Sequence, residues 1–229
     1  VVGLVGSEMC IRDRRHNVRA IIDTVAPSEV CAVVKADAYG HGDVPVAEAA
    51  LAAGAPRLAV ALVSEGARLR EAGIDAPILL LSEPIATDVS EVVQWNLVPT
   101  AYRMSFLEEL ERVAPVGYPV HVKIDTGMHR VGAPPEVALE LIRAVVAGPL
   151  HLEGVWTHFP VAEEDDVFTA GQTAVVREFV AALREEGIDP GIVHAANTAG
   201  ALGHPEARFD MVRPGIGIYG LRPAAGFAP

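Results

Sequence analysis

Short apolar runs alternate with longer amphipathic stretches through most of this 229-residue chain. The runs are apolar throughout rather than alternately polar, which is typical of strands in a sheet that is covered on both sides. Because eight such runs alternate with helical patterns, the sequence predicts a (β/α)8 barrel in the α/β class. The strands are expected at 30–34, 58–62, 78–81, 97–100, 120–124, 152–157, 192–194 and 210–213.

The helical patterns between these runs carry start and stop signals. The segment 64–72 opens at Ser64, has Glu65 in its first turn and is followed by Gly73, and Gly187 ends the longest pattern in the same way. The main helices are expected at 44–53, 64–72, 104–113, 135–146 and 168–186. An open, doubly wound sheet is the structural alternative, but no GxGxxG follows a strand, which disfavours a dinucleotide-binding version.

Composition excludes several classes of function. A net charge of −12 and a pI near 5.0 argue against nucleic acid or an anionic membrane as the main partner. Two cysteines, Cys10 and Cys31, form no disulfide framework and suit a reducing compartment. No apolar run is long enough to span a bilayer and no signal peptide is evident, so we expect a cytoplasmic protein without a metal site.

The segment 32–42, AVVKADAYGHG, places a lysine at the end of a buried strand. Such a position presents an amine to a small-molecule cofactor in barrel enzymes. Desolvation lowers the pKa of a lysine there and favours the neutral amine that forms a Schiff base. By itself, Lys35 is more consistent with a side chain that extends to solvent, and the rest of the chain changes this balance.

Polar side chains also follow four later strands, and in a barrel all of these strand ends meet at one rim. The convergence favours a functional site over separate structural roles for each residue. The residues are Lys123, Asp125, Thr126 and Arg130 at or just after the end of the fifth strand, His158 at the sixth, His194, Asn197 and Thr198 at the seventh, and Arg213 at the end of the eighth.

The segment 214–220, PGIGIYG, follows the last predicted strand. A proline and a glycine at this point can open a short helix whose bare backbone N–H groups bind an anion. Barrels often hold phosphate after strands seven and eight. A lysine that forms a Schiff base, a phosphate cradle and a rim arginine together describe a pyridoxal phosphate site.

From about His16 to the C-terminus, the chain resembles the barrel domain of the alanine racemase family. The resemblance rests on five motifs in the family's order, which are VVKADAYGHG, VKIDTGMHRVG, EGVWTHF, HAANTAG and FDMVRPGIGIYGLRP. It implies a pyridoxal 5'-phosphate enzyme that interconverts L- and D-alanine, supplies D-alanine for peptidoglycan and works as a homodimer.

The resemblance also assigns roles to individual residues. Lys35 would carry the cofactor and act as one of two racemisation bases, and Arg130 would lie near the cofactor's phenolic oxygen and the substrate carboxylate. Lys123 matches a position that is often carbamylated in the family. The cofactor's phosphate and ring would be held by Tyr39, Thr198, Gly215 and Ile216, by Arg213 against the pyridine nitrogen with His158 orienting it, and by Asn197.

The chain departs from the family pattern at both ends. Residues 1–14 do not match the short strand that usually precedes the His-Asn dipeptide and resemble translated adapter sequence, so a non-native leader is expected there and a barrel domain over 15–229. The family continues into a β-rich C-terminal domain that carries the second base, a tyrosine, and this domain is absent from the chain. The fragment alone is therefore expected to be impaired.

Other functions remain open on the residues. One alternative is a barrel-only pyridoxal phosphate-binding homeostasis protein. Another is a broad-specificity amino-acid racemase or a decarboxylase of similar fold. A third is an acidic structural domain whose strand-end residues only keep it in solution.

Overall fold

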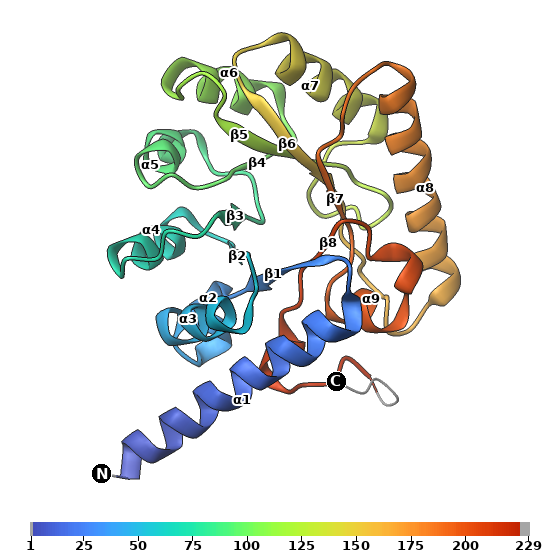
Figure 1. Cartoon of the computed structure of the whole chain (residues 1–229). Coiled ribbons are helices and arrows are strands. Elements are labelled where there is room, and N and C mark those ends of the chain that lie inside the picture. The colour runs from blue at the N-terminus through green and yellow to red at the C-terminus, as the bar shows by residue number, and fades with distance from the viewer. Residues whose placement is uncertain (1, 225–229) are drawn as a thin grey trace.

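Eight parallel strands form a barrel surrounded by helices (Figure 1). The computed structural model describes residues 2–224, with side chains from residue 11 onward. Neighbouring strands follow the order β3-β2-β1-β8-β7-β6-β5-β4, and every pairing is parallel. The strands are β1 (Glu29–Val33), β2 (Arg57–Val60), β3 (Ile78–Leu80), β4 (Thr100–Ala101), β5 (Pro119–Lys123), β6 (His151–Trp156), β7 (Ile192–His194) and β8 (Met211–Val212).

The two ends of this strand order meet at the segment before β4. Leu80 donates its N–H to the carbonyl of Val98 at 2.9 Å, and Val98 donates to the carbonyl of Ile78 at 2.9 Å. These bonds connect β3 to the chain just before β4 and bring the sheet round into a barrel, so the open-sheet alternative is wrong. The predicted strand 97–100 lies here, but only β4 (Thr100–Ala101) forms a ladder with β5.

The helices lie outside the strands, as the alternating pattern predicts (Figure 1). They are α1 (Val2–Val25), α2 (Lys35–Gly40), α3 (Asp43–Ala53), α4 (Val63–Glu71), α5 (Val89–Gln94), α6 (Met104–Val113), α7 (Pro135–Ala147), α8 (Asp166–Glu185) and α9 (Thr198–Gly203), with short 3₁₀ turns η1 (Ala86–Asp88), η2 (Pro205–Ala207) and η3 (Ile216–Tyr219). Gly187 follows α8 with a φ of 75°, which confirms its place as a helix stop.

One predicted helix start is wrong. Helix α4 begins at Val63, and Ser64 is already inside it without a side-chain capping bond. The carboxylate of Glu65 reaches back instead, accepting from the backbone N–H groups of Ala61 at 2.8 Å and Leu62 at 3.0 Å. A glutamate one turn into the helix satisfies free N–H groups as well as a hydroxyl cap does.

The strands are apolar because both of their faces are covered. Val30, Ala32, Leu58, Val120 and Val122 are essentially inaccessible and belong to one core that continues under the helices. Burial of a Val or Leu side chain stabilises the fold by about 1.5–3 kcal/mol. A barrel of this kind is a packed body, and its functional side chains lie at the rim where the strands end.

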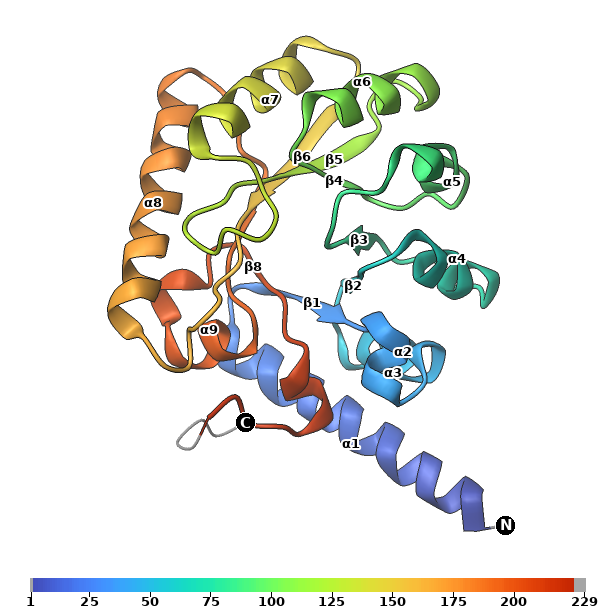
Figure 2. The same ribbon diagram turned by 180° about the vertical axis from the view of Figure 1, so that it is seen from behind.

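Helix α1 lies against α3 and η3, close to the C-terminal segment (Figures 1 and 2). The Asn17 side chain donates to the carbonyl of Ile218 at 3.0 Å, which ties this helix to the turn after β8. The helix runs without a break from Val2 to Val25, so residue 14 marks no change in its backbone. None of the helices within residues 2–224 is both long and apolar enough to cross a membrane.

Candidate active site

An open cavity lies at the rim where the parallel strands end, with about 850 Å³ of unfilled space, part of it open to solvent. Seen from the opposite side in Figure 2, the loop between β5 and α7 crosses in front of the strands. The ten residues to which the family resemblance assigns roles all line this cavity: Lys35, Tyr39, Lys123, Arg130, His158, Asn197, Thr198, Arg213, Gly215 and Ile216. Asp125, Thr126 and His194, which were also expected at the rim, are not among its lining residues.

The charged groups of the cavity are mostly cationic. Lys35, Lys123, Arg130 and Arg213 line it, against the single carboxylate of Glu163. The chain as a whole has a net charge of −12, so the balance in the cavity is opposite in sign to that of the whole chain. Concentrated positive charge in a partly desolvated cleft favours an anionic ligand such as a phosphate or a carboxylate. Lys35 and Lys123 are also the only lysines in the chain.

Lys35 lies just past the end of β1 and opens an unusual turn. The next four residues, Ala36 to Tyr39, all have φ between 52° and 57°, the left-handed region. Each non-glycine residue there costs roughly 1–2 kcal/mol, and such strain gathers at functional sites. Burial, and then the nearby Arg130, lower the pKa of Lys35, which favours its neutral amine.

Glu65 supports this strained turn, a role that the sequence analysis missed. Its Oε1 accepts from the backbone N–H of Ala36 at 2.6 Å, while its Oε2 accepts from Ala61 and Leu62. One carboxylate therefore connects the turn after β1 to the start of α4. The Glu65 charge also acts to raise the pKa of Lys35, against the effect of burial.

The turn after β8 forms a close-fitting wall opposite Tyr39. The backbone N–H groups of Gly215 and Gly217 donate to Oγ1 of Thr198 at 3.0 and 3.2 Å. The sequence analysis expected bare N–H groups here. Those of Gly215 and Gly217 are instead paired with Thr198, the first residue of α9. A Cβ at Gly215 would collide with the hydroxyl of Tyr39, so a glycine is required for this approach.

Arg213 is almost fully buried, with 3% of its surface exposed, and its guanidinium is held from several sides. It donates to the carbonyls of Thr157 at 2.7 Å and Ala195 at 2.9 Å, and to Nδ1 of His194 at 2.5 Å. Burial lowers its pKa to about 9, which still leaves it protonated at neutral pH. The result is a fixed cation in the cavity wall.

His194, rather than His158, makes the close imidazole contact with Arg213. His158 Nδ1 is 3.5 Å from Nη2 of Arg213, a full ångström longer than the His194 contact. Burial, followed by the charge of Arg213, lowers the pKa of both histidines well below the usual range. The signal for His194 was available, since it ends β7, but the sequence alone did not distinguish it from a core histidine.

Trp156, the last residue of β6, is a second residue that the sequence analysis missed. Its ring faces the Arg213 guanidinium carbon at 4.4 Å and Lys123 Nζ at 4.3 Å from the centroid, and it stacks on His194. Cation–π contacts of this kind offset part of the cost of burying two like charges near each other. Trp156 therefore helps to keep both cations in the wall.

Lys123 and Arg130 differ sharply in exposure. Lys123 is 2% exposed, and burial, with the charges of Arg213 and Arg130, lowers its pKa to about 7. Arg130 is exposed on the loop after β5, which Asp125 shapes by accepting from the N–H groups of Gly127 and His129 at 3.0 and 3.1 Å. The cavity thus has one buried lysine and one arginine free to adjust to a ligand.

The Asn197 side chain is occupied by the fold. Its Oδ1 accepts from the N–H of Gly200 at 2.9 Å and caps α9, and its Nδ2 donates to the carbonyl of Phe159 at 3.2 Å. Asn197 lines the cavity while its polar atoms serve the helix start. Its contribution is to place Thr198, the next residue, beside the glycines of the β8 turn.

A parallel (β/α)8 barrel with a lysine and other cationic side chains in a cavity at its C-terminal rim is a fold and site of the class that holds a phosphorylated cofactor. The family follows from comparison with known proteins. Residues 11–223 match the model of the alanine racemase N-terminal domain, and the chain belongs to this family, whose enzymes use pyridoxal phosphate.

Curated relatives are similar along most of this chain. The alanine racemase of Treponema pallidum subsp. pallidum is 46% identical over 220 residues, covering 91% of this chain and 58% of the relative. That of Treponema denticola is 44% identical over 204 residues, covering 86% of this chain and 54% of the relative. The chain therefore spans about half the length of the curated relatives it matches.

Solved structures agree with the fold. Alanine racemase from Bacillus anthracis with bound L-Ala-P superimposes with a TM-score of 0.87 at 36% identity, over 94% of this chain and 57% of that one. Alanine racemase from Clostridium difficile 630 gives a TM-score of 0.90 at 33% identity, over 95% of this chain and 59% of that one. These structures are of whole racemases, and the similarity covers their N-terminal part.

Proposed function

We propose that this chain forms the cofactor-binding barrel of an alanine racemase, which interconverts L- and D-alanine with pyridoxal 5'-phosphate. The observation that carries the proposal is the cavity with four cationic side chains, one of them a lysine whose pKa is lowered by burial. In a chain with a net charge of −12, a concentration of four basic side chains at the barrel rim favours a functional site. The curated relatives, which carry the alanine racemase name, support the same activity.

The residues present fit the cofactor. We propose that the hydroxyls of Tyr39 and Thr198 and the backbone at Gly215 and Ile216 hold its phosphate. The space that a Cβ at Gly215 would fill, beside the Tyr39 hydroxyl, supports this assignment. Arg213, fixed in the cavity wall, is proposed to donate to the pyridine nitrogen, and Lys35 is proposed to bond covalently to the cofactor.

Bound pyridoxal phosphate supplies an electron-accepting ring that acidifies the Cα–H of an attached amino acid. Because a guanidinium can only donate, Arg213 would donate to the ring nitrogen, which would then stay unprotonated and withdraw electrons only moderately. Lys35, with its lowered pKa, can take and return a proton at Nζ on one face of the substrate. The exposed Arg130 suits pairing with the substrate carboxylate.

Inversion of a stereocentre requires a base on each face. We propose that the second base is the tyrosine that the family resemblance implies, located in the part of the relatives that this chain does not cover. Homodimerisation belongs to the same proposal. Exposed apolar side chains close in sequence to cavity residues support it, with Leu62 60%, Ile85 62% and Leu221 58% exposed.

We also propose that Lys123 is carbamylated. A pKa of about 7 leaves a substantial share of its amine neutral at physiological pH. A neutral amine adds to carbon dioxide through a new N–C bond, and a proton is released. The resulting carbamate would place a negative charge among Arg213, Arg130 and Lys35, whose charges all oppose protonation of this lysine.

Three further assignments remain proposals. The D-alanine would be used in peptidoglycan, and the protein would act in the cytoplasm on a small molecule rather than on nucleic acid or a membrane. Residues 1–14 are proposed to be a leader outside the barrel domain at 15–229. Thermal denaturation of a chain that starts at residue 15 tests the proposed leader. Its melting temperature should be unchanged, because Asn17 and the rest of α1 keep their contacts with the barrel.

Deuterium exchange at Cα tests the proposed activity. The chain is loaded with pyridoxal phosphate, and L-alanine and D-alanine are followed separately in D₂O, alone and within a complete racemase polypeptide. Cα exchange with inversion supports the racemase. Cofactor binding without exchange of either enantiomer in the complete polypeptide favours the barrel-only homeostasis protein instead. Faster exchange of another amino acid favours the broad-specificity racemase.

A further inference from the structure

A line of hydrogen-bonded side chains continues from Arg213 away from the cavity and into the barrel, and it is buried at His194 and His121 and partly exposed at Glu153. We propose that this line, formed by His194, His121 and Glu153, fixes the tautomers of both histidines, so that Arg213 is held as a hydrogen-bond donor at the cavity. His121 and Glu153 are then positioning residues for the cofactor site. The inference rests on the proposed function only in assigning Arg213 to the cofactor.

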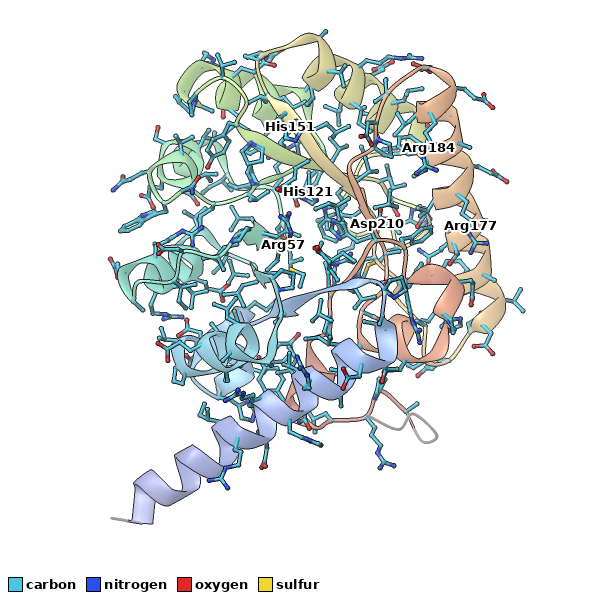
Figure 3. The ribbon with its side chains drawn as sticks, in the orientation of Figure 1. Arg57, His121, His151, Arg177, Arg184 and Asp210 are labelled. Atoms are coloured by element: carbon cyan, nitrogen blue, oxygen red, sulfur yellow. The ribbon has the colours of Figure 1, made fainter. Side chains whose placement is uncertain are left out.

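The contacts form one unbroken series. Arg213 Nη1 lies 2.5 Å from His194 Nδ1, His194 Nε2 lies 2.9 Å from His121 Nδ1, and His121 Nε2 lies 3.0 Å from Glu153 Oε2. Glu153 Oε1 accepts from Nη1 of Arg57 at 3.0 Å. Figure 3 labels His121 and Arg57 inside the ring of strands, so the series runs through the barrel interior.

The donors and acceptors at the two ends of the series allow only one arrangement of the histidine protons. Arg57 and Arg213 can only donate, and an ionised Glu153 can only accept. His121 must therefore carry its proton on Nε2 to donate to Glu153, which leaves Nδ1 as an acceptor. His194 must then carry its proton on Nε2 to donate to His121, which leaves its Nδ1 free to accept from Arg213.

Burial makes this pattern costly to break. His121, His194 and Arg213 are 1%, 0% and 3% exposed, so water cannot replace a lost partner. Burial, above all, lowers the pKa of both histidines and keeps them neutral. Burial alone would raise the pKa of Glu153, but the hydrogen bond from His121 and the neighbouring Arg57 lower it to about 2 and keep it ionised.

A glycine on the neighbouring strand leaves room for the series. Gly154 pairs with His121 across β5 and β6, and a Cβ there would come within 2.7 Å of the imidazole Nδ1. The same position would also collide with the carbonyl of Ile192. Any side chain at residue 154 would displace the ring, so the barrel interior is shaped to admit it.

The hydrogen bonds to the fold leave part of the Arg213 guanidinium available at the cavity. Arg213 has five N–H groups, and the contacts to His194, Thr157 and Ala195 use three of them. The guanidinium is then fixed over Trp156, with two N–H groups left for other partners. If His194 carried its proton on Nδ1 instead, two donors would face each other at 2.5 Å and the guanidinium would have to move.

Glu153→Gln tests this arrangement of donors and acceptors, because glutamine has nearly the same shape as glutamate. Arg57 can only donate, so it takes the amide oxygen and turns the amide NH₂ toward His121 Nε2. His121 must then accept there and carry its proton on Nδ1, which forces the His194 proton onto Nδ1. ¹⁵N shifts of selectively labelled histidines in the cofactor-free chain report each tautomer, with assignment by substitution of one histidine at a time.

We expect both protons on Nε2 in the natural chain and both on Nδ1 in Glu153→Gln. Adding Arg57→Leu to Glu153→Gln frees the amide to turn back, so the original tautomers should return. Glu29→Gln is the matched control, because Glu29 is half-exposed, lies 3.7 Å from Nε of Arg57 and makes no hydrogen bond to either histidine in the described part of the chain. It should leave both tautomers unchanged.

The cofactor provides a second readout. Glu153→Gln should weaken pyridoxal phosphate binding about tenfold, and the double variant should recover most of it. An Nδ1 proton on either histidine in the natural chain overturns the inference, as do unchanged tautomers in Glu153→Gln. Expected tautomers in this chain, together with no exchange of the Cα proton of alanine in the complete racemase polypeptide, would refute the proposed activity and leave the inference intact.

Discussion

The two sides of the cavity are built on opposite principles. On the β1 side, Lys35 is only half-buried and sits at the start of a left-handed turn. On the β8 side, Arg213 is 3% exposed, lies against Trp156 and donates to groups at the ends of two other strands, β6 and β7. The first side holds its cation at a strained backbone turn, and the second holds its cation through hydrogen bonds to two backbone carbonyls and one imidazole.

This difference matches what each cation is proposed to do. A lysine that bonds to a cofactor and then moves a proton must change both partner and protonation state, so partial exposure and a lowered pKa suit it. An arginine that only polarises a ring atom must stay in place and stay charged. Predictions that separate the two sides therefore test the proposed division of roles.

The largest effect is expected at Lys35. Lys35→Arg keeps the positive charge but removes the amine that can form a Schiff base, so alanine racemisation should fall by about 10²–10⁴-fold. Borohydride reduction of the loaded natural chain, followed by peptide mapping, should place the pyridoxyl group on Lys35. With only two lysines in the sequence, a label on Lys123 would assign the covalent role to the wrong side of the cavity.

The next largest effect is expected on the β8 side, where substitution of Arg213 should lower the stability of the fold. Arg213→Gln removes donors from the carbonyls of Thr157 and Ala195, and each buried acceptor left unpaired costs about 1–3 kcal/mol. Urea denaturation should report a lower free energy of unfolding without a change in m-value. The exposed arginine of the Arg143–Glu186 pair serves as the control, and Arg143→Gln should cost far less. Equal losses would mean that Arg213 is not held as described.

A smaller effect is expected where the two sides meet. Gly215→Ala drives a Cβ into the hydroxyl of Tyr39, and since Tyr39 is 37% exposed it can swing aside. We expect the fold to survive and pyridoxal phosphate to bind about tenfold more weakly, because overpacking typically costs about 1–3 kcal/mol. Equilibrium titration of the cofactor measures this.

The matched control is another glycine with free space around it. A Cβ at Gly171 in α8 meets nothing within 4 Å, so Gly171→Ala should leave cofactor affinity unchanged and stabilise the helix by about 0.5–1 kcal/mol. Unchanged affinity in Gly215→Ala would remove the cradle from the proposed phosphate site.

The sequence predicted the barrel because strand runs and helix patterns are local signals that repeat. It also predicted most of the side chains that share the cavity, since parallel strands bring their ends to one rim, but Asp125, Thr126 and His194 do not line it. Lys123 ends β5, for example, and Arg213 follows β8, as their patterns indicated. The family motifs added roles for these residues that patterns alone could not assign.

What the sequence did not reveal depends on contacts between distant segments. Glu65 looked like an ordinary first-turn acid, yet it accepts the N–H of Ala36 across 29 residues. His194 reaches His121 across 73 residues, and nothing in either motif names the other. The left-handed turn at Ala36–Tyr39 contradicts local preference, because non-glycine residues disfavour it and only the surrounding fold enforces it.

The smallest expected effect concerns the electrostatics of Lys35, and two substitutions should move its pKa in opposite directions. The charge of Arg130 lowers the pKa of Lys35, so Arg130→Gln should raise it. The charge of Glu65 raises that pKa, so Glu65→Gln should lower it further. Reductive ¹³C-methylation of the cofactor-free chain gives one NMR signal for each of the two lysines, and each signal can be titrated.

Lys123 serves as an internal reference in the same spectra. Arg130 also lowers the pKa of Lys123, whereas Glu65 is not among the charges that act on it. Arg130→Gln should therefore raise both lysine pKa values, and Glu65→Gln should move Lys35 alone. If Glu65→Gln shifted both lysines together, the carboxylate would be acting through a change in the whole cavity. The pKa of Lys35 could then not be changed on its own, and the proposed difference between the β1 side and the side built around Arg213 would be wrong.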